Sequence, residues 1–90
     1  MLFMVVERFR NRDAAAVYRR YLERGRMMPE GLSYVASWVE TNCDRCFQLM
    51  ESDDPALFGR WTAQWEDLME FEIIPVVTSA EALEAHTPRP

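Results

Sequence analysis

Apolar residues near the start of the chain follow the period of a strand and then that of a helix. Residues 2–9 are rich in valine, phenylalanine and methionine, which is typical of a β-strand. Residues 14–22 repeat apolar side chains at three- and four-residue steps, so they predict an amphipathic helix. Asn11 or Asp13 can cap this helix, and Gly25 is placed to end it.

A hairpin, a second helix and a fourth strand are predicted in the rest of the chain. Residues 32–52 hold two strand-like runs around a turn at residues 41–44, which predicts a β-hairpin. An Asp-Pro pair begins the segment 54–69, whose apolar residues recur at helical spacing. Residues 71–78 predict a strand, and residues 79–83 a short helical stretch whose first serine can act as the cap.

This order of elements, strand-helix-strand-strand-helix-strand, is that of the ferredoxin-like α+β fold. The fold has an antiparallel four-stranded sheet with its first and third strands at the centre and two helices on one face. Pro75 in the fourth strand agrees with this order, because proline lacks a backbone donor and is tolerated at a sheet edge. We expect a single domain over residues 1–85 and a loose tail at residues 86–90.

Both faces of the predicted sheet carry apolar side chains. Successive strand residues point to opposite faces, yet Val5 and Val6 are both apolar, as are Ile73 and Ile74. Helices are available to cover only one face, so the other face needs a partner. The simplest symmetric solution is a second copy of the chain, and we therefore predict a homodimer paired through this sheet face.

Composition and charge narrow the choice of partners. The chain has 90 residues and a net charge of −5, from 10 basic and 15 acidic residues, which gives no electrostatic reason to bind nucleic acid or anionic lipid. No run approaches the ~20 apolar residues that span a bilayer, and the N-terminus lacks the pattern of a signal peptide. We expect a soluble, cytoplasmic protein that binds neither nucleic acid nor membranes.

The hairpin holds the first candidates for a ligand site. If Trp38 and Gln48 line the same cavity, the result is an apolar pocket with a few polar anchors, which is the usual composition of a small-molecule site. Alternatively, Trp38 belongs to the dimer interface and Gln48 satisfies a backbone group, and we favour this second interpretation. Strand alternation places the following residues on the same face as Trp38: Tyr34, Ala36 and Glu40.

Glu7 and Arg26 are the charged candidates for the same site. Glu7, on a central strand, becomes a general base with a raised pKa if it is buried without a partner. Pairing with Arg8, with Arg45 or with a residue of the other subunit is the more common arrangement, and we favour it. Arg26 and Glu30 lie in the loop after the first helix, where such residues can gate the mouth of a pocket.

The cysteines and tryptophans have structural interpretations that we prefer to chemical ones. Cys43 and Cys46 have the spacing of a redox or zinc pair, but the other half of a zinc site is missing, since the only histidine, His86, lies in the predicted tail. We predict a turn cysteine and a buried strand cysteine, with no metal and no cofactor. Trp61 and Trp65, about one helical turn apart, are expected in the core.

Three segments carry a resemblance to a known family: Glu51–Asp54, Trp65–Leu68 and Phe71–Val76. With them, about residues 1–80 of the chain resemble a family of short bacterial proteins classified as a domain of unknown function. That family is similar to the dimeric α/β-barrel superfamily, which implies a ferredoxin-like chain and pairing through the sheets, but no particular activity. Some superfamily members have a histidine after the second-strand tryptophan. Val39 takes that place here, so histidine-based chemistry is not implied.

Two functional hypotheses follow from these observations. The first is a small homodimeric barrel that binds a small, partly apolar molecule, or acts on it without a cofactor. The second is a non-catalytic interaction or regulatory module whose second sheet face serves only assembly. The sequence does not favour an enzymatic over a non-enzymatic role.

Overall fold

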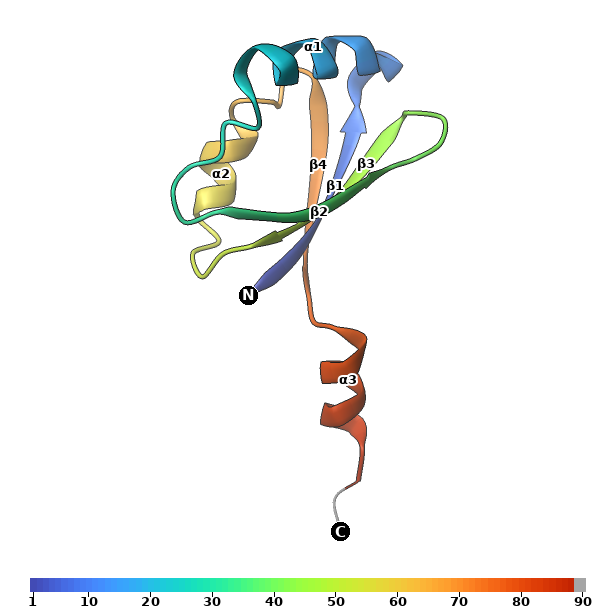
Figure 1. Ribbon diagram of the computed structural model, residues 1–90, viewed down its shortest axis with the longest axis vertical. Helices are drawn as coiled ribbons and strands as arrows, with labels where there is room; N and C mark the ends of the chain where they lie inside the picture. Colours follow the sequence, from blue (N-terminus) through green and yellow to red (C-terminus); the bar gives the residue numbers. More distant parts are fainter. Residues whose placement is uncertain (89–90) are drawn as a thin grey trace.

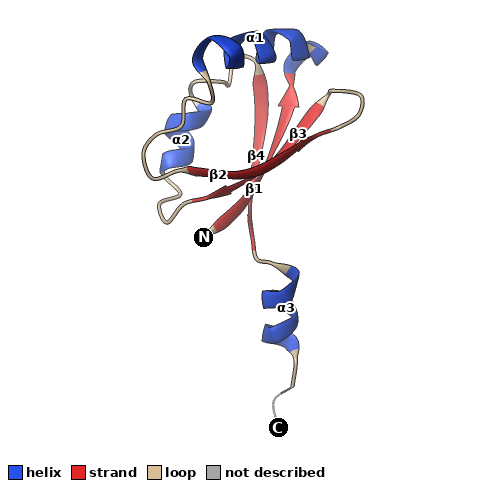
Figure 2. Cartoon of the chain, viewed as in Figure 1, coloured by secondary structure: helices blue, strands red, loops and turns tan. Residues whose placement is uncertain are grey.

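The structure is a computed structural model of the chain that describes residues 1–88 (Figure 1). Its elements follow the order of the ferredoxin-like fold, which confirms the predicted α+β class. Figure 2 shows the strands gathered in one sheet, with helices beside it and beyond its end. The elements are β1 (Leu2–Phe9), the 3-10 helix η1 (Arg10–Arg12), α1 (Ala14–Arg24), β2 (Ser33–Val39), β3 (Arg45–Glu51), α2 (Leu57–Thr62), β4 (Met69–Val76) and α3 (Ser79–His86).

The four strands form one antiparallel sheet in the order β2-β3-β1-β4. Val5 at the middle of β1 lies opposite Gln48 of β3 on one side and opposite Ile73 of β4 on the other. The predicted central position of the first and third strands is therefore confirmed. Pro75 lies in the edge strand β4, where the absence of a proline N–H costs no hydrogen bond to a further strand.

One face of the sheet packs against α1 and α2 and forms the core. Val5 and Met50 have no exposed surface, and Trp61 of α2 is 2% exposed. The ring of Phe3 meets that of Phe58 edge to face, with 4.8 Å between their centroids, which joins β1 to α2. The buried apolar residues are Phe3, Val5, Phe9, Val17, Leu32, Cys46, Met50, Phe58, Trp61, Trp65 and Met69.

The opposite face of the sheet, here called the outer face, carries apolar side chains that no helix of the described chain covers. Val6 of β1 and Phe47 of β3 are paired near its centre, and Trp38 of β2 lies beside Phe47. Trp38 is 57% exposed, and Ile74 of β4 is 38% exposed. The apolar residues of the outer face are Leu2, Met4, Val6, Ala36, Trp38, Phe47, Leu49, Ile74 and Val76.

The limits of α1 follow from its end residues. The Asp13 carboxylate accepts a hydrogen bond from the Ala16 N–H at 3.1 Å, so Asp13 is the N-cap, as predicted. At the other end Gly25 has a positive φ of 68°, and its N–H donates to the carbonyl of Tyr21 at 2.7 Å. A residue with a side chain rarely adopts this backbone conformation, which explains why the helix stops at a glycine.

The second helix is shorter than its sequence predicts. The apolar spacing indicated a helix from residue 54 to Met69, but α2 ends at Thr62. The chain then continues in tight turns with backbone bonds to the third or fourth preceding residue, such as the 2.9 Å bond from the Trp65 N–H to the Thr62 carbonyl. Such turns keep nearly the same side-chain spacing as an α-helix, so the pattern does not mark the helix end. β4 also begins earlier than predicted, at Met69.

A β-bulge in β2 interrupts the alternation of side chains along this strand. Tyr34 lies opposite Met50, and Ala36 lies opposite Leu49, the neighbour of Met50. Val35 is therefore an extra residue in the ladder. The bulge moves every residue before it to the face opposite to the one that simple alternation gives.

Two consequences of the bulge contradict the sequence prediction. Tyr34 lies on the helix-side face together with Ser37, and their hydroxyl oxygens are 2.8 Å apart. The prediction that Tyr34 shares a face with Trp38 is therefore wrong. Trp38, paired with Phe47, lies on the outer face, whereas Gln48 lies on the helix-side face, so these two residues do not line one cavity.

The helix α3 projects away from the rest of the chain, beyond the end of β4 (Figure 1). Its cap is Thr78 and not Ser79, because Thr78 and Glu81 form a reciprocal capping box in which the Thr78 hydroxyl accepts from the Glu81 N–H at 3.1 Å. None of the residues of α3 is buried, and Leu83 is 70% exposed. Capping therefore stabilises this helix without help from a core.

α3 is longer than predicted, and it includes part of the predicted tail. The sequence indicated an end at Leu83, but the helix continues to His86, whose Nδ1 lies 2.9 Å from the carbonyl oxygen of Ala82. His86 is thus the last helical residue. Residues 89–90 of the predicted tail lie outside the described residues.

Candidate functional site

A cavity of about 170 Å³ lies between α1, the sheet and the segment that contains α2. Tyr18, Tyr21 and Val39 are partly exposed and form its mouth, while buried side chains such as Glu7 and Trp61 form its floor. The lining is largely apolar, with five aromatic rings and a small number of polar groups. Its residues are Glu7, Phe9, Val17, Tyr18, Tyr21, Arg26, Ser37, Val39, Cys46, Gln48, Trp61, Trp65 and Met69.

Glu7 is the buried carboxyl group of this cavity, with only 5% of its surface exposed. Burial raises the pKa of Glu7 from 4.5 to about 7, while a hydrogen bond from Cys46 and the charge of Arg26 act in the opposite direction. Pairing of Glu7 with Arg8 or Arg45, which the sequence favoured, is wrong. Arg8 is exposed, and Arg45 binds Glu40 with 2.7 Å between nitrogen and oxygen.

Cys46 lies directly opposite Glu7 in the pairing of β1 with β3. Burial and the neighbouring carboxyl group raise the pKa of the Cys46 thiol to about 12, so this thiol is protonated at neutral pH and donates to Glu7. Cys43 is exposed in the turn, and both cysteines are free. The predicted arrangement of one turn cysteine and one buried cysteine is confirmed.

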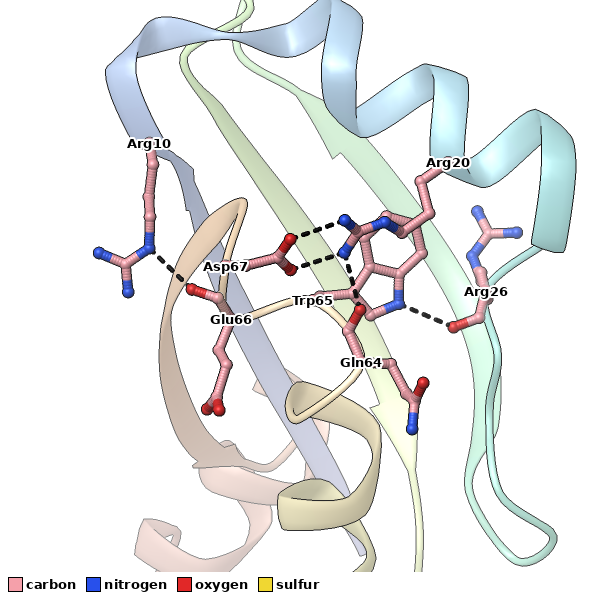
Figure 3. A network of polar contacts seen from close by, with 7 residues as sticks. All are labelled: Arg10, Arg20, Arg26, Gln64, Trp65, Glu66 and Asp67. Atoms are coloured by element: carbon pink, nitrogen blue, oxygen red, sulfur yellow. Dashed lines mark hydrogen bonds and ion pairs between the residues drawn. The ribbon is translucent and has the colours of Figure 1, made fainter.

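The loop that carries Arg26 is fixed by both core tryptophans. The indole N–H of Trp61 donates to the Arg26 carbonyl at 2.9 Å, and that of Trp65 donates to the same oxygen at 3.0 Å (Figure 3 shows the second bond). The guanidinium of Arg26 lies 3.8 Å from the ring centroid of Tyr34 and 5.1 Å from that of Tyr21. Arg26 therefore reaches the cavity from a backbone position that two hydrogen bonds hold.

A second arginine joins α1 to the segment after α2, on the side of Trp65 (Figure 3). Both terminal guanidinium nitrogens of Arg20 donate to the carboxylate of Asp67 at 2.6 Å, and one of them also donates to the Gln64 carbonyl at 3.0 Å. The bond to Arg20 holds the pKa of Asp67 below its usual value. This bidentate pair fixes the position of α1, which carries the tyrosines at the mouth of the cavity, relative to the tryptophans at its floor.

Three of the five predicted ligand-binding residues line the cavity: Glu7, Arg26 and Gln48. Tyr34 contacts it indirectly, because its ring stacks on Arg26. Trp38 is on the outer face and takes no part. The amide nitrogen of Gln48 donates to the sulfur of Met50 at 3.3 Å rather than to the backbone group that the sequence suggested. A thioether is a weak acceptor, so this amide can exchange that bond for one to a ligand.

The sequence did not indicate the aromatic part of the cavity. Tyr18 and Tyr21 were recognised only as members of the apolar stripe of α1, and Trp61 and Trp65 only as core residues. The two tryptophans are indeed buried, at 2% and 3% exposure, and they also form the cavity floor. One sequence feature could have indicated this part of the cavity. It is Arg26, a charged residue that follows Tyr18 and Tyr21 closely along the chain.

Two further properties of the described residues bear on the kind of site. Within residues 1–88, no three His, Cys, Asp or Glu side chains gather closely enough to hold a metal ion. In the same part of the chain, no helix combines the length and the apolar character needed to cross a bilayer. The groups of the cavity that can interact with a ligand are thus its carboxyl group, its guanidinium and its aromatic rings.

Comparison with known proteins gives a family but no activity. Residues 1–89 match the family described as Domain of unknown function (DUF3303). The chain belongs to this family. No curated protein and no solved structure gives a significant match. The cavity and the outer face are therefore the features of this family member that bear on its function.

The cavity brings together groups that can bind a ligand and exchange a proton with it. A carboxyl group whose pKa is about 7 is near the point at which it both accepts and donates protons at neutral pH. Arg26 supplies a positive charge, and the tyrosine and tryptophan rings supply apolar contact area. A titratable group shifted by burial within an apolar cavity is a common property of functional sites.

Proposed function

We propose that this protein is a homodimer that binds a small, partly apolar molecule in the cavity and acts on it by proton transfer through Glu7, without a metal or an organic cofactor. The observation that carries this proposal is the single buried carboxyl group among the aromatic rings of the cavity. Burial of such a group costs stability, which a purely structural position avoids by using an apolar residue. A role with a ligand accounts for its presence.

The size of the cavity limits the ligand. About 170 Å³ is close to the ~150 Å³ of apolar cavities that accommodate one benzene molecule, and it is smaller than the ~300–1,000 Å³ of pockets for drug-sized ligands. The ligand therefore has about the size of one six-membered ring with small substituents. Tyr18 and Tyr21, each about 40% exposed, leave room for a substituent to extend through the mouth.

The outer face supports the homodimer part of the proposal. It presents a continuous set of apolar residues from β2 to β4, of which Trp38 and Ile74 are the most exposed. Its charged side chains include Arg45 and Glu40, which are paired at one end, and Glu72 of the edge strand β4, which lies opposite Val6. An apolar centre with a polar rim is the usual composition of a protein interface, and pairing of two such faces buries both without a second type of chain.

A ligand screen by thermal denaturation tests the binding part. We expect one class of small ring compounds to raise the melting temperature by about 10–20 °C at 100 times the dissociation constant, since such occupancy contributes about 2.7 kcal/mol to a 90-residue protein. Gln48→Ala should weaken this effect, and Trp38→Ala, which truncates an aromatic residue on the other face, should not. If no small molecule stabilises the protein, the outer face alone is functional and the non-catalytic interaction module is the correct interpretation.

Light scattering of the purified protein tests the dimer. We expect twice the mass of the chain for the wild type, and the mass of one chain for Leu49→Glu, which places a charge at the centre of the outer face. Leu22→Glu is the matched control, because Leu22 is 83% exposed on α1, away from the sheet. A monomeric wild type would contradict the proposal.

A further inference from the structure

We propose that the ligand of the cavity is a compact organic monoanion, whose acidic group binds Arg26, whose apolar ring lies among the tryptophans, and whose opposite end carries a hydrogen-bond donor for Glu7. This inference rests on the function proposed above and specifies its ligand class. It follows from the state of Arg26, from the presence of Glu7 and Arg26 in one cavity without an ion pair between them, and from the apolar lining of that cavity.

Arg26 differs from the other half-buried arginines of residues 1–88. Arg20, Arg26 and Arg45 are the three of intermediate burial in this part of the chain. Arg20 binds the carboxylate of Asp67 through two nitrogens, and Arg45 binds that of Glu40 in the same way. Arg26 forms no ion pair with any of the described residues, and its side-chain hydrogen bond is the 3.3 Å contact with the Tyr21 hydroxyl.

The guanidinium of Arg26 therefore keeps most of its hydrogen-bonding capacity. It has five N–H donors in a planar fork, and such a fork matches a carboxylate or a phosphate through two parallel bonds. Its central carbon lies over the rings of Tyr34 and Tyr21, 3.8 Å and 5.1 Å from their centroids. Contacts of this kind orient the fork, and apart from the one bond to the Tyr21 hydroxyl its N–H groups can bind an anion.

The site is also prepared in advance of binding. The Arg26 carbonyl accepts two indole N–H groups, at 2.9 Å and 3.0 Å, so the backbone at this position is held whether or not a ligand is present. Less conformational freedom is lost on binding when the binding group is already fixed. A residue that only covers the surface needs no such support.

Glu7 and Arg26 share one cavity but do not form an ion pair. The positive charge of Arg26 stabilises the carboxylate form of Glu7, although burial outweighs this effect. An anionic group placed beside Glu7 would be repelled, whereas one beside Arg26 is attracted. The anion is therefore oriented, with its charge at the mouth and its neutral end at the floor.

The lining between the two charged residues suits a flat apolar body. Trp61, Trp65 and Phe9 are all buried and all line the cavity. At the floor, the Glu7 carboxyl has the thiol of Cys46 as its hydrogen-bond partner, which is a weak donor. A hydroxyl or amino group of the ligand makes a stronger bond to Glu7 and replaces the thiol.

Titration calorimetry with matched ring compounds tests this inference, with 4-hydroxybenzoate as the anionic probe. 4-Hydroxybenzamide and 4-hydroxybenzyl alcohol are the neutral probes, and 4-hydroxybenzamidine is the cationic one. We expect 4-hydroxybenzoate to bind at least tenfold more tightly than each of these three, and more tightly than benzoate, which lacks the hydroxyl group. Each comparison changes only one end of the molecule.

Two variants assign the two ends. Arg26→Gln should reduce the affinity for both carboxylates by at least tenfold and leave the neutral probes unchanged. Glu7→Gln should reduce the preference for the hydroxyl group without changing the preference for the anion. Arg24→Gln, an exposed arginine of α1, is the control for the loss of one charge. The circular dichroism spectrum of each variant establishes that it is folded.

Three results would overturn the inference. One is equal binding of the neutral and anionic rings, another is no effect of Arg26→Gln, and the third is no binding of any ring compound. The first two leave the proposed function intact, because a small molecule still binds in the cavity. If no ring compound binds, the thermal denaturation screen described above still tests the proposed function with other small molecules. Failure of this inference can therefore be distinguished from failure of the proposed function.

Discussion

Glu7 of β1 and Cys46 of β3 are direct cross-strand partners, and the thiol of one hydrogen-bonds to the carboxyl group of the other on the buried face of the sheet. The pair places a carboxylic acid beside a thiol, which is a weaker acid, and both are buried away from water. Burial favours the neutral form of each, so both pKa values are raised, to about 7 for Glu7 and to about 12 for Cys46. These two residues have measurable consequences for stability and for reactivity.

The first prediction concerns the dependence of stability on pH. The pKa of Glu7 is about 7 in the folded chain and 4.5 as the ordinary value, so the folded state holds a proton that the unfolded state releases between these two pH values. The free energy of unfolding should therefore decrease as pH rises from about 4.5 to about 7, by an amount on the order of 3 kcal/mol from this group. Above that range it should not change further through Glu7.

Glu7→Gln should remove this dependence, so the variant should gain stability relative to the wild type as the pH increases from 5 to 8. Urea denaturation at the two pH values measures the difference. Glu23→Gln, which removes an exposed carboxylate from α1, is the control for the loss of one charge. A difference between wild type and Glu7→Gln that is equal at both pH values would show that Glu7 is not buried in solution.

The second prediction concerns the two thiols. Cys43 is exposed and Cys46 is buried, so a thiol reagent at pH 8 should modify one cysteine per chain quickly and the other only as fast as the protein opens. A reagent that releases a chromophore allows the rate and the number of modified thiols in each phase to be measured by absorbance. Cys43→Ser should abolish the fast phase and leave the slow one. Two fast phases would contradict the burial of Cys46.

The third prediction concerns two glycines that differ in their surroundings. A Cβ at Gly59 in α2 would meet no atom within 4 Å, so Gly59→Ala should stabilise the protein by about 0.5–1 kcal/mol through helix propensity. At Gly31 the φ angle is +94° and a Cβ would lie 2.9 Å from Cδ1 of Leu57, so Gly31→Ala should destabilise it. Urea denaturation of the two variants should give changes of opposite sign.

The fourth prediction concerns the carbonyl of Arg26. Trp61→Phe or Trp65→Phe removes one of its two indole bonds, each worth about 1 kcal/mol, and leaves the other. The double variant leaves a partly buried carbonyl without either donor, and such a group costs about 1–3 kcal/mol. The loss of stability in the double variant should therefore exceed the sum of the single losses. If the loss of stability in the double variant equals the sum of the two single losses, the two bonds do not depend on each other.

The fifth prediction concerns α3 and the predicted domain limit at residue 85. None of the residues of α3 is buried, so truncation after Thr78 should lower the helix content while the melting temperature changes by only a few degrees. Circular dichroism gives both quantities. A large loss of stability would show that α3 packs against another subunit in solution, and would support a domain that extends to residue 85.

Features with a strong local cause could be predicted from the sequence. The limits of β1 and the cap and stop of α1 follow from apolar composition, from Asp13 and from Gly25, each of which acts within a few residues. The sheet order follows from the sequence of elements and from Pro75. In each case one physical preference dominates, and the rest of the fold agrees with it.

The candidate site could be predicted only in part, since its geometry depends on contacts between distant segments. Glu7, Gln48 and Arg26 were identified as residues, but the partner of Glu7 and the position of Tyr34 were not. Val35 carries no sequence signal for a bulge, because a β-branched residue is equally suited to a regular strand. The end of α2 was missed for a similar reason, as tight turns preserve the spacing of an α-helix.

The extra residue at Val35 makes the site sensitive to chain length as well as to residue identity. Because Tyr34 lies before the bulge and Trp38 after it, only one of these aromatic residues contacts Arg26, and the other remains on the outer face. A relative lacking one residue at this point would have the same amino acids around it, yet would orient one of the two the opposite way. Insertions and deletions in this strand should therefore separate family members with different ligands more clearly than substitutions do.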